Sequence, residues 1–406
     1  MSRSDWFGDL PSSWRAAPLG YYFDVVLGKM LNGSKHSAGE TQAPYLAAGS
    51  IQPEHLVLDE TKTMAFTEAE LAQYDLRKGD IVVVEGGAGY GRSYLLAEDM
   101  PGWGFQNHVA RVRGRGSVRP GFLIYCLKAC LASGFIEANN RTATLPSLSR
   151  DVLRALPIPI PALPEQREIA NYLDRETLQI DTLIGEQQRL IEMLRERRAA
   201  IGDRHFYSRS GKRETTLRRV IRPLARPAIQ GLGVVTAYRD GSVTLRSNKR
   251  DEGYTFSDTE QGYQEVRVGD LVFHALDGFA GAVGISDSHG NATPVYHVCE
   301  VVSDDDPVYL AMLLRYLGVS GYLATQAPNV RQRSVDFRNW ATFARVPVAL
   351  PAADVQRDVV AEVRKETAKI DTLIAETEKF IELAVERRSA LIIAAVTGQV
   401  DVREAA

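Results

Sequence analysis

The chain has 406 residues, a formal net charge of −3 and 45% hydrophobic residues, as expected of a globular protein with room for two or more domains. A net charge this small excludes a polybasic protein that coats any polyanion, although nucleic acid can still bind to a local charged surface. Three cysteines exclude a disulfide framework and fit a reducing cytoplasm. The sequence shows no signal-peptide pattern, and no run approaches the roughly 18 apolar residues of a membrane-spanning helix, so we expect a cytoplasmic protein.

Residues 1–155 form a first variable segment of short predicted strands and one clear helix. The predicted elements are an edge strand or short helix at Leu19–Leu27, a strand at Ile81–Val84, a glycine-rich loop at Gly86–Arg92, a helix at Phe122–Ala132 and a strand at Leu156–Pro161. Cys126 and Cys130 lie one helical turn apart in an apolar run. With no second ligand pair nearby, they are expected to be buried small hydrophobes and not metal ligands.

Residues 156–205 contain a predicted long helix whose sequence is repeated near the C-terminus. The stretch from Ile180 to Ile201, IDTLIGEQQRLIEMLRERRAAI, returns from Ile370 to Leu391 as IDTLIAETEKFIELAVERRSAL, a shift of 190 residues (370 − 180). Apolar positions in both copies alternate steps of four and three, which is the heptad pattern of a coiled coil. The predicted stripe in the first copy comprises Leu173, Thr177, Ile180, Ile184, Gln187, Ile191, Leu194, Arg198 and Ile201. Two surface helices of separate domains are the alternative, but the repeat favours helices that pair as a rigid spacer.

The second variable segment, residues 206–345, has the same predicted order of elements as the first but a different sequence. Residues 346–406 contain the second copy of the long helix. Gly269-Asp270 matches Gly79-Asp80 at an offset of 190, and Pro307 matches Pro120 at 187. His297-Val298 is aligned with His108-Val109 at 189. The framework is therefore kept while the loops differ.

The loop after Val84 resembles a nucleotide-binding turn, and VVVEGGAGYG is similar to the first motif of adenosylmethionine-dependent methyltransferases. No long helix pattern follows Gly91, and the chain has no Asp/Asn-Pro-Pro-aromatic tetrapeptide to hold a flipped base. We therefore favour a backbone turn that lets the chain approach DNA, with cofactor binding and plain turn chemistry as the alternatives.

Catalytic patterns are missing as well. No histidine pair has metalloprotease spacing, and no nuclease, phosphate-loop or nucleophile-elbow motif is present. The acidic run Asp304–Asp306 before Pro307 is predicted to be a solvated helix start. The chain is expected to have no catalytic or metal site of its own.

The remaining candidate role is recognition, and it is expected to use polar side chains in or beside the loops, because Arg, Lys, Asn and Gln read base edges and phosphates. The DNA-binding candidates are Lys35, His36, Arg92, Asn107, His108, Arg246, Asn248, Lys249, Arg250, His274, Arg331 and Arg333. Solvated surface is the alternative for each one, and Asn107, His108 and His297 could instead form hydrogen bonds in the core. Four apolar residues outside the helix stripe are partner-binding candidates: Leu183, Leu190, Leu373 and Phe380.

Over its whole length the chain resembles the specificity subunit of type I restriction–modification enzymes. The motifs that carry this resemblance are LPIPIPALPEQREIANYLD, the two IDTLI helices and the terminal ERRSALIIAAVTGQVDV. The second variable segment lacks the full QNH element that the first carries at Gln106–His108, which puts His297 in doubt as an equivalent.

The resemblance implies an α+β fold with two α/β target-recognition domains joined by two long helices packed as an antiparallel coiled coil, an internal pseudo-two-fold repeat. Each domain would read one half of a split, asymmetric double-stranded DNA sequence. The implied partners are two modification subunits and also restriction subunits, which would hold adenosylmethionine, ATP and Mg, with no cofactor in this chain. The alternatives are a complete methyltransferase, a coiled-coil adaptor that does not bind DNA, and an orphan specificity protein without partner genes.

Overall fold

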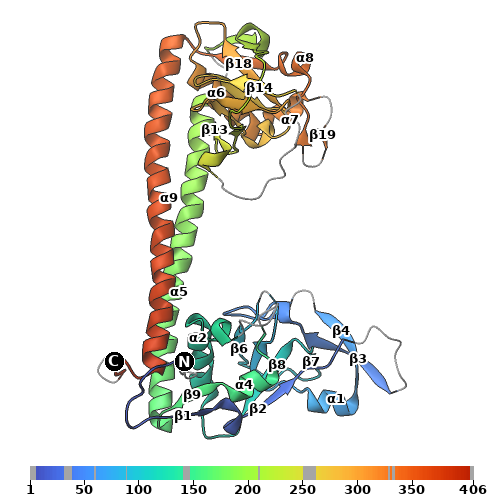
Figure 1. Ribbon diagram of the computed structural model, residues 1–406, viewed down its shortest axis with the longest axis vertical. Helices are drawn as coiled ribbons and strands as arrows, with labels where there is room; N and C mark the ends of the chain where they lie inside the picture. The colour runs from blue at the N-terminus through green and yellow to red at the C-terminus, as the bar shows by residue number, and fades with distance from the viewer. Residues whose placement is uncertain are drawn as a thin grey trace. The chain divides into compact units, whose positions relative to one another are not determined.

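The computed structural model describes residues 6–31, 39–58, 61–87, 89–139, 147–208, 211–249, 262–327, 330–331 and 334–402. The chain divides into two compact units (Figure 1): unit 1 is Met1–Gln188 with Glu378–Ala406, and unit 2 is Arg189–Thr377. Each unit contains one of the two strand-rich segments and part of each long helix, so the predicted mixture of α/β domains and long helices is confirmed. No helix in these ranges is long and apolar enough to cross a membrane.

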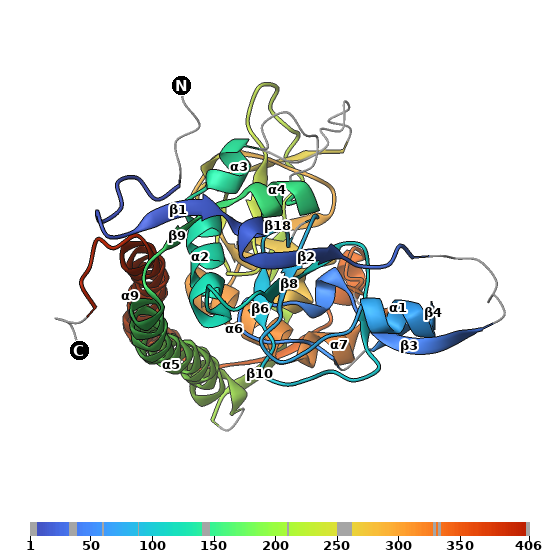
Figure 2. The ribbon, with the colours of Figure 1, turned by 90° about the horizontal axis from the view of Figure 1, so that it is seen from below.

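The strands of unit 1 form a four-stranded sheet, a three-stranded sheet and a two-stranded antiparallel pair. Its strands are β1 (Arg15–Pro18), β2 (Phe23–Leu27), β3 (Glu40–Leu46), β4 (Lys62–Thr67), β5 (Ile81–Val84), β6 (Ser93–Leu95), β7 (Gly104–Phe105), β8 (Val109–Gly114) and β9 (Pro157–Ile160). Its helices are η1 (Leu19–Tyr21), η2 (Ala48–Ser50), α1 (Glu68–Gln73), α2 (Pro120–Ala132), α3 (Phe135–Asn139), α4 (Arg150–Ala155) and the first part of α5 (Leu163–Gly202). β1 and β9 pair antiparallel (Figure 2).

The main sheet of unit 1 has the strand order β2-β8-β5-β6. All four residues of β5 are buried, as their continuous apolar run predicts. The helix α2 contributes Phe122 and Cys126 to the same core as Val25 and Ile81. Cys126 and Cys130 are buried small side chains, as predicted, and burial raises the pKa of both thiols. The stretch Leu19–Leu27 was predicted to be a strand or a short helix, and it contains both: first the short helix η1 and then the strand β2.

Unit 2 repeats the plan with shorter strands. These are β10 (Arg213–Thr216), β11 (Ile221–Pro223), β12 (Val235–Ala237), β13 (Val243–Leu245), β14 (Gln264–Val266), β15 (Leu271–His274), β16 (Val283–Ile285), β17 (Gly290–Ala292), β18 (Tyr296–Val301), β19 (Val330–Arg331), β20 (Ser334–Val335) and β21 (Pro347–Leu350). Its helices are η3 (Asp203–Tyr207), η4 (Leu217–Arg219), η5 (Arg246–Asn248), η6 (Gly278–Ala280), α6 (Pro307–Val319), α7 (Tyr322–Gln326), α8 (Trp340–Phe343) and part of α9 (Ala353–Val396).

The main sheet of unit 2, β11-β18-β15-β16, has the order of the unit 1 sheet, element for element. Its register corrects one alignment made from sequence. Val83 pairs with Ala110 in unit 1, and the equivalent Phe273 pairs with His297 in unit 2. His297 is therefore the counterpart of Ala110 and not of His108, because the connection before β18 is three residues shorter relative to β15, an offset of 187 in place of 190.

A buried glutamine starts each long helix in the same way. Gln166 accepts a hydrogen bond from the Arg119 backbone N–H ahead of α2 and donates to the Pro161 carbonyl, at 2.9 Å each. Gln356 accepts from the Asp306 N–H at 2.8 Å and donates to the Pro351 carbonyl at 2.9 Å. Both amides are fully buried, so Gln166 holds α5 against the start of α2, and Gln356 holds α9 against the start of α6.

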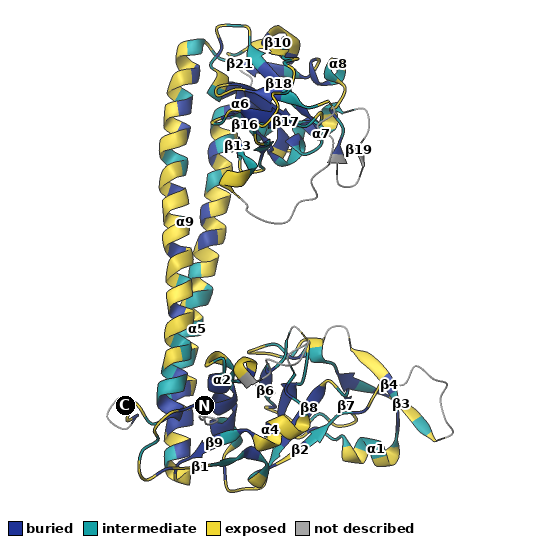
Figure 3. Cartoon of the chain, in the orientation of Figure 1, coloured by how far each residue is buried: buried dark blue, intermediate teal, exposed yellow. Residues whose placement is uncertain are grey.

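The predicted coiled-coil stripe is confirmed, since all of its positions in α5 and α9 are buried or half-buried (Figure 3). The helices run antiparallel. In unit 1 Arg388 is ion-paired with Asp181, and in unit 2 Arg198 bonds Asp371 at 2.7 Å. These two pairs are copies of each other, because 181 and 198 each recur 190 residues later as 371 and 388.

The acidic run before α6 was predicted to be solvated, which is wrong for its central residue. Asp306 caps α6 by accepting from the Tyr309 N–H at 2.9 Å. Asp305 is buried and accepts from Gln356 at 2.6 Å and Arg213 at 2.8 Å. These donors outweigh the cost of burying the carboxylate and lower its pKa.

Candidate nucleic-acid interface

One end of the main sheet in unit 1 carries two of the predicted DNA-binding residues. Where β5 ends and β8 begins, the Glu85 N–H donates to the His108 carbonyl at 2.9 Å. The His108 side chain is 56% exposed, with Nδ1 4.0 Å from Glu85. Asn107 next to it is half-buried and donates its backbone N–H to the Lys29 carbonyl at 2.9 Å. The backbone of this end is therefore fixed, while the His108 imidazole faces solvent.

The glycine-rich loop of unit 1 is a turn between two strands. Gly87 and Gly91 have φ of 81° and 77°, where other residues are strained, and β6 follows the loop with no helix after it. A helix N-terminus is what gives such loops their affinity for phosphate, so this loop lacks the geometry of a nucleotide site. Arg92 lies apart from Asn107 and His108: its guanidinium donates to Gln52 at 3.2 Å and lines a pocket with Lys128 and Arg388.

In unit 2 the equivalent end of the sheet contains a polar cavity of about 490 Å³. It brings together two predicted residues, Arg246 after β13 and His274 at the end of β15. The His274 Nδ1 accepts from the backbone N–H groups of Leu276 and Asp277, at 3.2 and 3.0 Å. Burial lowers the pKa of His274, so the ring is neutral near pH 7 and its Nε2–H is a donor.

The rim of this cavity includes residues that the sequence reasoning missed. Tyr238, Arg239 and Tyr296 line it, and Arg239 is ion-paired with Asp277 at 3.1 Å. Tyr238 and Arg239 lead into the turn between β12 and β13, and the Asp240-Gly241 pair is a recognisable hairpin signal that could have identified them.

Two further predicted residues lie beside that hairpin. The Lys249 ammonium is 4.5 Å from the Tyr238 ring centroid and ion-paired with Asp240. Asn248 donates from Nδ2 to the Thr244 hydroxyl at 2.8 Å. Arg246, Asn248, Lys249 and His274 therefore belong to one neighbourhood in unit 2.

The other predicted DNA-binding positions cannot be placed. Lys35, His36, Arg250 and Arg333 lie outside the described residues, and Arg331 is in β19 with a side chain outside them too. His297, for which both roles were open, is in the core. Its Nε2 is 2.7 Å from the Phe337 carbonyl and its ring stacks on Phe343.

The four partner-binding candidates are on the outer surface of the long helices. Leu183, Leu190, Leu373 and Phe380 are 38%, 36%, 48% and 43% exposed. Apolar side chains this exposed, in matching positions of both helix copies, are typical of a surface that another protein covers. Within the described residues no group of three or more His, Cys, Asp or Glu could hold a metal ion.

Residues 11–192 match the family model described as "Type I restriction modification DNA specificity domain". These residues are therefore similar to the DNA specificity domain of type I restriction–modification systems. The matched model describes a DNA specificity domain and not a catalytic domain, which agrees with the prediction that the chain is not an enzyme.

Two solved structures share the fold of this chain. One, reported with the structural basis of complex assembly and conformational transition of the type I R-M system, has a TM-score of 0.74 at 14% identity. The match covers 97% of this chain and 100% of that one. The HsdS subunit from Thermoanaerobacter tengcongensis has a TM-score of 0.55 at 14% identity and covers 97% and 98%. No curated protein sequence matches the chain.

Proposed function

We propose that the chain reads a bipartite, asymmetric double-stranded DNA sequence, with unit 1 reading one half and unit 2 the other. The observation that carries this proposal is the shared strand order of the two main sheets beneath unlike loops. A duplicated framework with divergent loops fits two sites for related ligands that differ in sequence.

The side chains at the two sheet ends have the chemistry to read bases. The Nε2–H of His274 can donate to an acceptor on a base edge, and Arg246 can bond guanine or phosphate. In unit 1 the exposed His108 and the neighbouring Asn107 supply donors and acceptors, and an Asn amide matches the edge of adenine. The hairpin with Tyr238, Arg239 and Lys249 adds hydrogen-bond donors and aromatic surface beside the unit 2 cavity.

The partners follow from this role. Two modification subunits, carrying adenosylmethionine, would methylate adenine at the sites that this chain selects, and restriction subunits would use ATP and Mg to translocate and cut DNA. The exposed rows Leu183 with Leu190 and Leu373 with Phe380 would bind the modification subunits. The complex would act in the cytoplasm, on DNA.

The test is to exchange residues 1–155 for the same segment of a relative with a different target. Genomic methylation is then mapped by single-molecule sequencing in cells that also make the modification subunit. One half-site should change and the other should stay, because unit 2 is untouched. A double substitution, Arg246→Ala with His274→Ala, is the matched perturbation of unit 2. An unchanged methylated sequence after the segment exchange would refute the assignment.

A further inference from the structure

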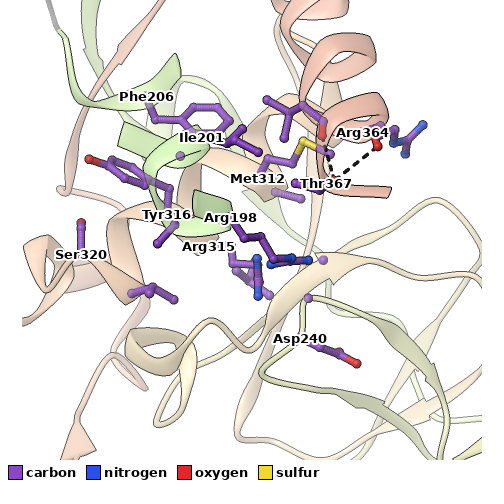
Figure 4. A pocket seen from close by; sticks show the side chains of 18 of the residues that line it. Arg198, Ile201, Phe206, Asp240, Met312, Arg315, Tyr316, Ser320, Arg364 and Thr367 are labelled. Atoms are coloured by element: carbon purple, nitrogen blue, oxygen red, sulfur yellow. Dashed lines mark hydrogen bonds between the residues drawn. The ribbon is translucent and has the colours of Figure 1, made fainter. Parts of the chain in front are cut away.

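Unit 2 contains a second cavity, of about 710 Å³, on the side of α6 that faces the long helices (Figure 4). Its walls come from the last turns of α5, from α6, from the hairpin at Asp240-Gly241 and from α9 near Val363. Apolar residues such as Ile201, Val308 and Met312 line it together with arginines. We call it the arginine pocket.

Arg315 of α6 is the unusual residue of this pocket. The side chain is half-buried, its Nε is inaccessible to solvent and without a hydrogen-bond partner, and Nη2 reaches the Arg239 carbonyl at a long 3.4 Å. No carboxylate of the described residues lies within ion-pair distance of it. Burial, and then the neighbouring Arg198, lower the pKa of Arg315. A cation held this way lacks the anion that would normally compensate its burial.

The side chain is held in place by packing. A Cβ on Gly241 would lie 2.8 Å from Arg315 Cδ, and one on Gly281 would lie 3.4 Å from its Cγ. Both glycines have positive φ, 91° and 92°, so these turns and the arginine stem fit closely. The guanidinium is thus directed into the pocket by the fold itself, as Figure 4 shows.

The acidic residues around the pocket already have partners. Asp371 binds Arg198 at 2.7 Å, and Asp203 accepts from the Tyr316 hydroxyl at 2.8 Å. Asp240 is bonded to Lys249 and Ser242, which lower its pKa to about 2. Among the described residues of unit 2, none therefore supplies a carboxylate for Arg315.

Unit 1 shows what fills the equivalent place. Lys128 of α2 is the counterpart of Arg315 at the 187 offset, and Arg388 is the counterpart of Arg198 at 190. Both bind the carboxylate of Glu54, at 3.1 Å and 2.8 Å, from the loop after η2. The remaining cavity is only about 190 Å³. One glutamate of the chain thus closes in unit 1 the site that is open in unit 2.

We propose that the arginine pocket binds an acidic side chain of the modification subunit, a Glu or Asp flanked by apolar residues, as Glu54 is bound in unit 1. This inference rests on the proposed function, since the partner is the one named there. The apolar walls favour a folded polypeptide over DNA, because a phosphate flanked by sugars would lose hydration there without apolar contacts in return.

The experiment uses the full chain and the modification subunit encoded with it. Binding is measured by titration calorimetry for wild type, Arg315→Met and Lys128→Met. Loss of one member of a buried charged pair weakens binding strongly, so Arg315→Met should raise Kd by about tenfold or more. The matched Lys128→Met should change Kd by less than about threefold, since Lys128 binds Glu54 within the chain.

The contact itself is checked by crosslinking. A photoreactive p-benzoylphenylalanine replaces Met312 in the pocket wall, and mass spectrometry should find it joined to a modification-subunit peptide that contains Asp or Glu. Lysine at that acidic position should restore binding to an Arg315→Glu variant. A wild-type chain that does not bind the subunit would overturn the proposed function itself. If Arg315→Met binds the modification subunit normally, or affects DNA binding alone, the proposed role of the arginine pocket is wrong and the proposed function still stands.

Discussion

The two units bury an equivalent aspartate but neutralise it with arginines from different parts of the sheet. Asp80 in unit 1 accepts from the Arg77 N–H and from Nε and Nη2 of Arg113 on β8, each at 2.7 Å. Asp270 in unit 2 accepts from the Arg267 N–H at 2.7 Å and from Arg226, which follows β11, at 2.5 and 2.9 Å.

A charge reversal explains the change of arginine. Arg113 stands opposite Asp24 in the unit 1 sheet, whereas the corresponding cross-strand pair in unit 2 is Glu300 opposite Arg222. Glu300 is acidic and cannot form an ion pair with Asp270. Arg226, which follows β11, pairs with Asp270 instead. The repeat has kept the buried carboxylate, which holds the turn before the central strand, and has let its partner move.

The largest expected effect comes from shortening both copies of the long helix together. The deletion removes Gln187–Met193 with Thr377–Leu383, one heptad from each helix, which keeps the stripe in phase. It spares the Asp181–Arg388 and Arg198–Asp371 pairs. If the helices set the spacing of the half-sites, a loss of about 10 Å should shorten the gap by up to about three base pairs.

Methylation mapping is the measurement, and both half-sites should stay the same. Three base pairs also rotate one half-site by about 100°, so a smaller shift with a bent duplex is within expectation. Deleting the heptad from one helix alone should abolish methylation, because the two ion pairs can then no longer form in one register. Sites that keep the parent gap in an active double deletion would show that the helices are not the ruler.

The buried aspartates allow a paired stability test. Asp80→Ala leaves Arg113 half-buried beside Asp75, and Asp270→Ala leaves Arg226 without its partner, so each should cost about 3–5 kcal/mol in its own unit. Urea unfolding followed by hydrogen exchange should show unit 1 weakened by the first variant and unit 2 by the second. Equal loss of protection in both units from either substitution would mean that the units do not unfold separately.

These contacts mark the limit of what the sequence could predict. The helix stripe followed from the heptad spacing of apolar residues, and the buried strand Ile81–Val84 followed from its continuous apolar run. The Asp80–Arg113 and Asp270–Arg226 pairs did not, since they depend on which strands become neighbours. His297 was misaligned with His108 for the same reason: only the strand register shows that it replaces Ala110.

At the candidate DNA interface the difficulty was similar. Arg246 and His274 were chosen as polar loop residues, and their common cavity arises from two strands that are distant in sequence. Arg92 was chosen by the same rule, yet its side chain turns towards Gln52 and the helix side. Residue type and loop position therefore indicate candidates, but not the direction of a side chain.

A moderate effect is expected from the exposed rows on the two helices. Leu183→Asp and Leu373→Asp place a charge at equivalent positions of α5 and α9, 38% and 48% exposed, and should weaken binding of the modification subunit about tenfold each. The fold should survive because neither position belongs to the buried stripe. Gln188→Asp, exposed on another face of α5, is the control. If both leucine variants co-purify with the subunit as wild type does, the rows are not its binding surface.

The smallest expected effect is a pH dependence that unit 2 owes to His297. Burial lowers the pKa of this imidazole, so the folded state binds its proton less readily than the unfolded state, whose pKa is about 6.5. The stability that results is fully present above that value and is lost as pH falls below it, by at most about 1.4 kcal/mol per pH unit for one proton.

The test is the variant His297→Ala, which gives unit 2 the residue that unit 1 has at Ala110. The variant will be less stable overall, because stacking on Phe343 and the bond to Phe337 disappear. Its urea midpoint for unit 2 should nevertheless fall less than that of wild type between pH 7 and 5.5. His274 has a pKa lowered in the same direction, so part of the slope should persist in the single variant and diminish further when His274→Ala is added. Equal slopes in wild type and His297→Ala would mean that His297 takes up its proton as readily in the folded unit as in the unfolded chain.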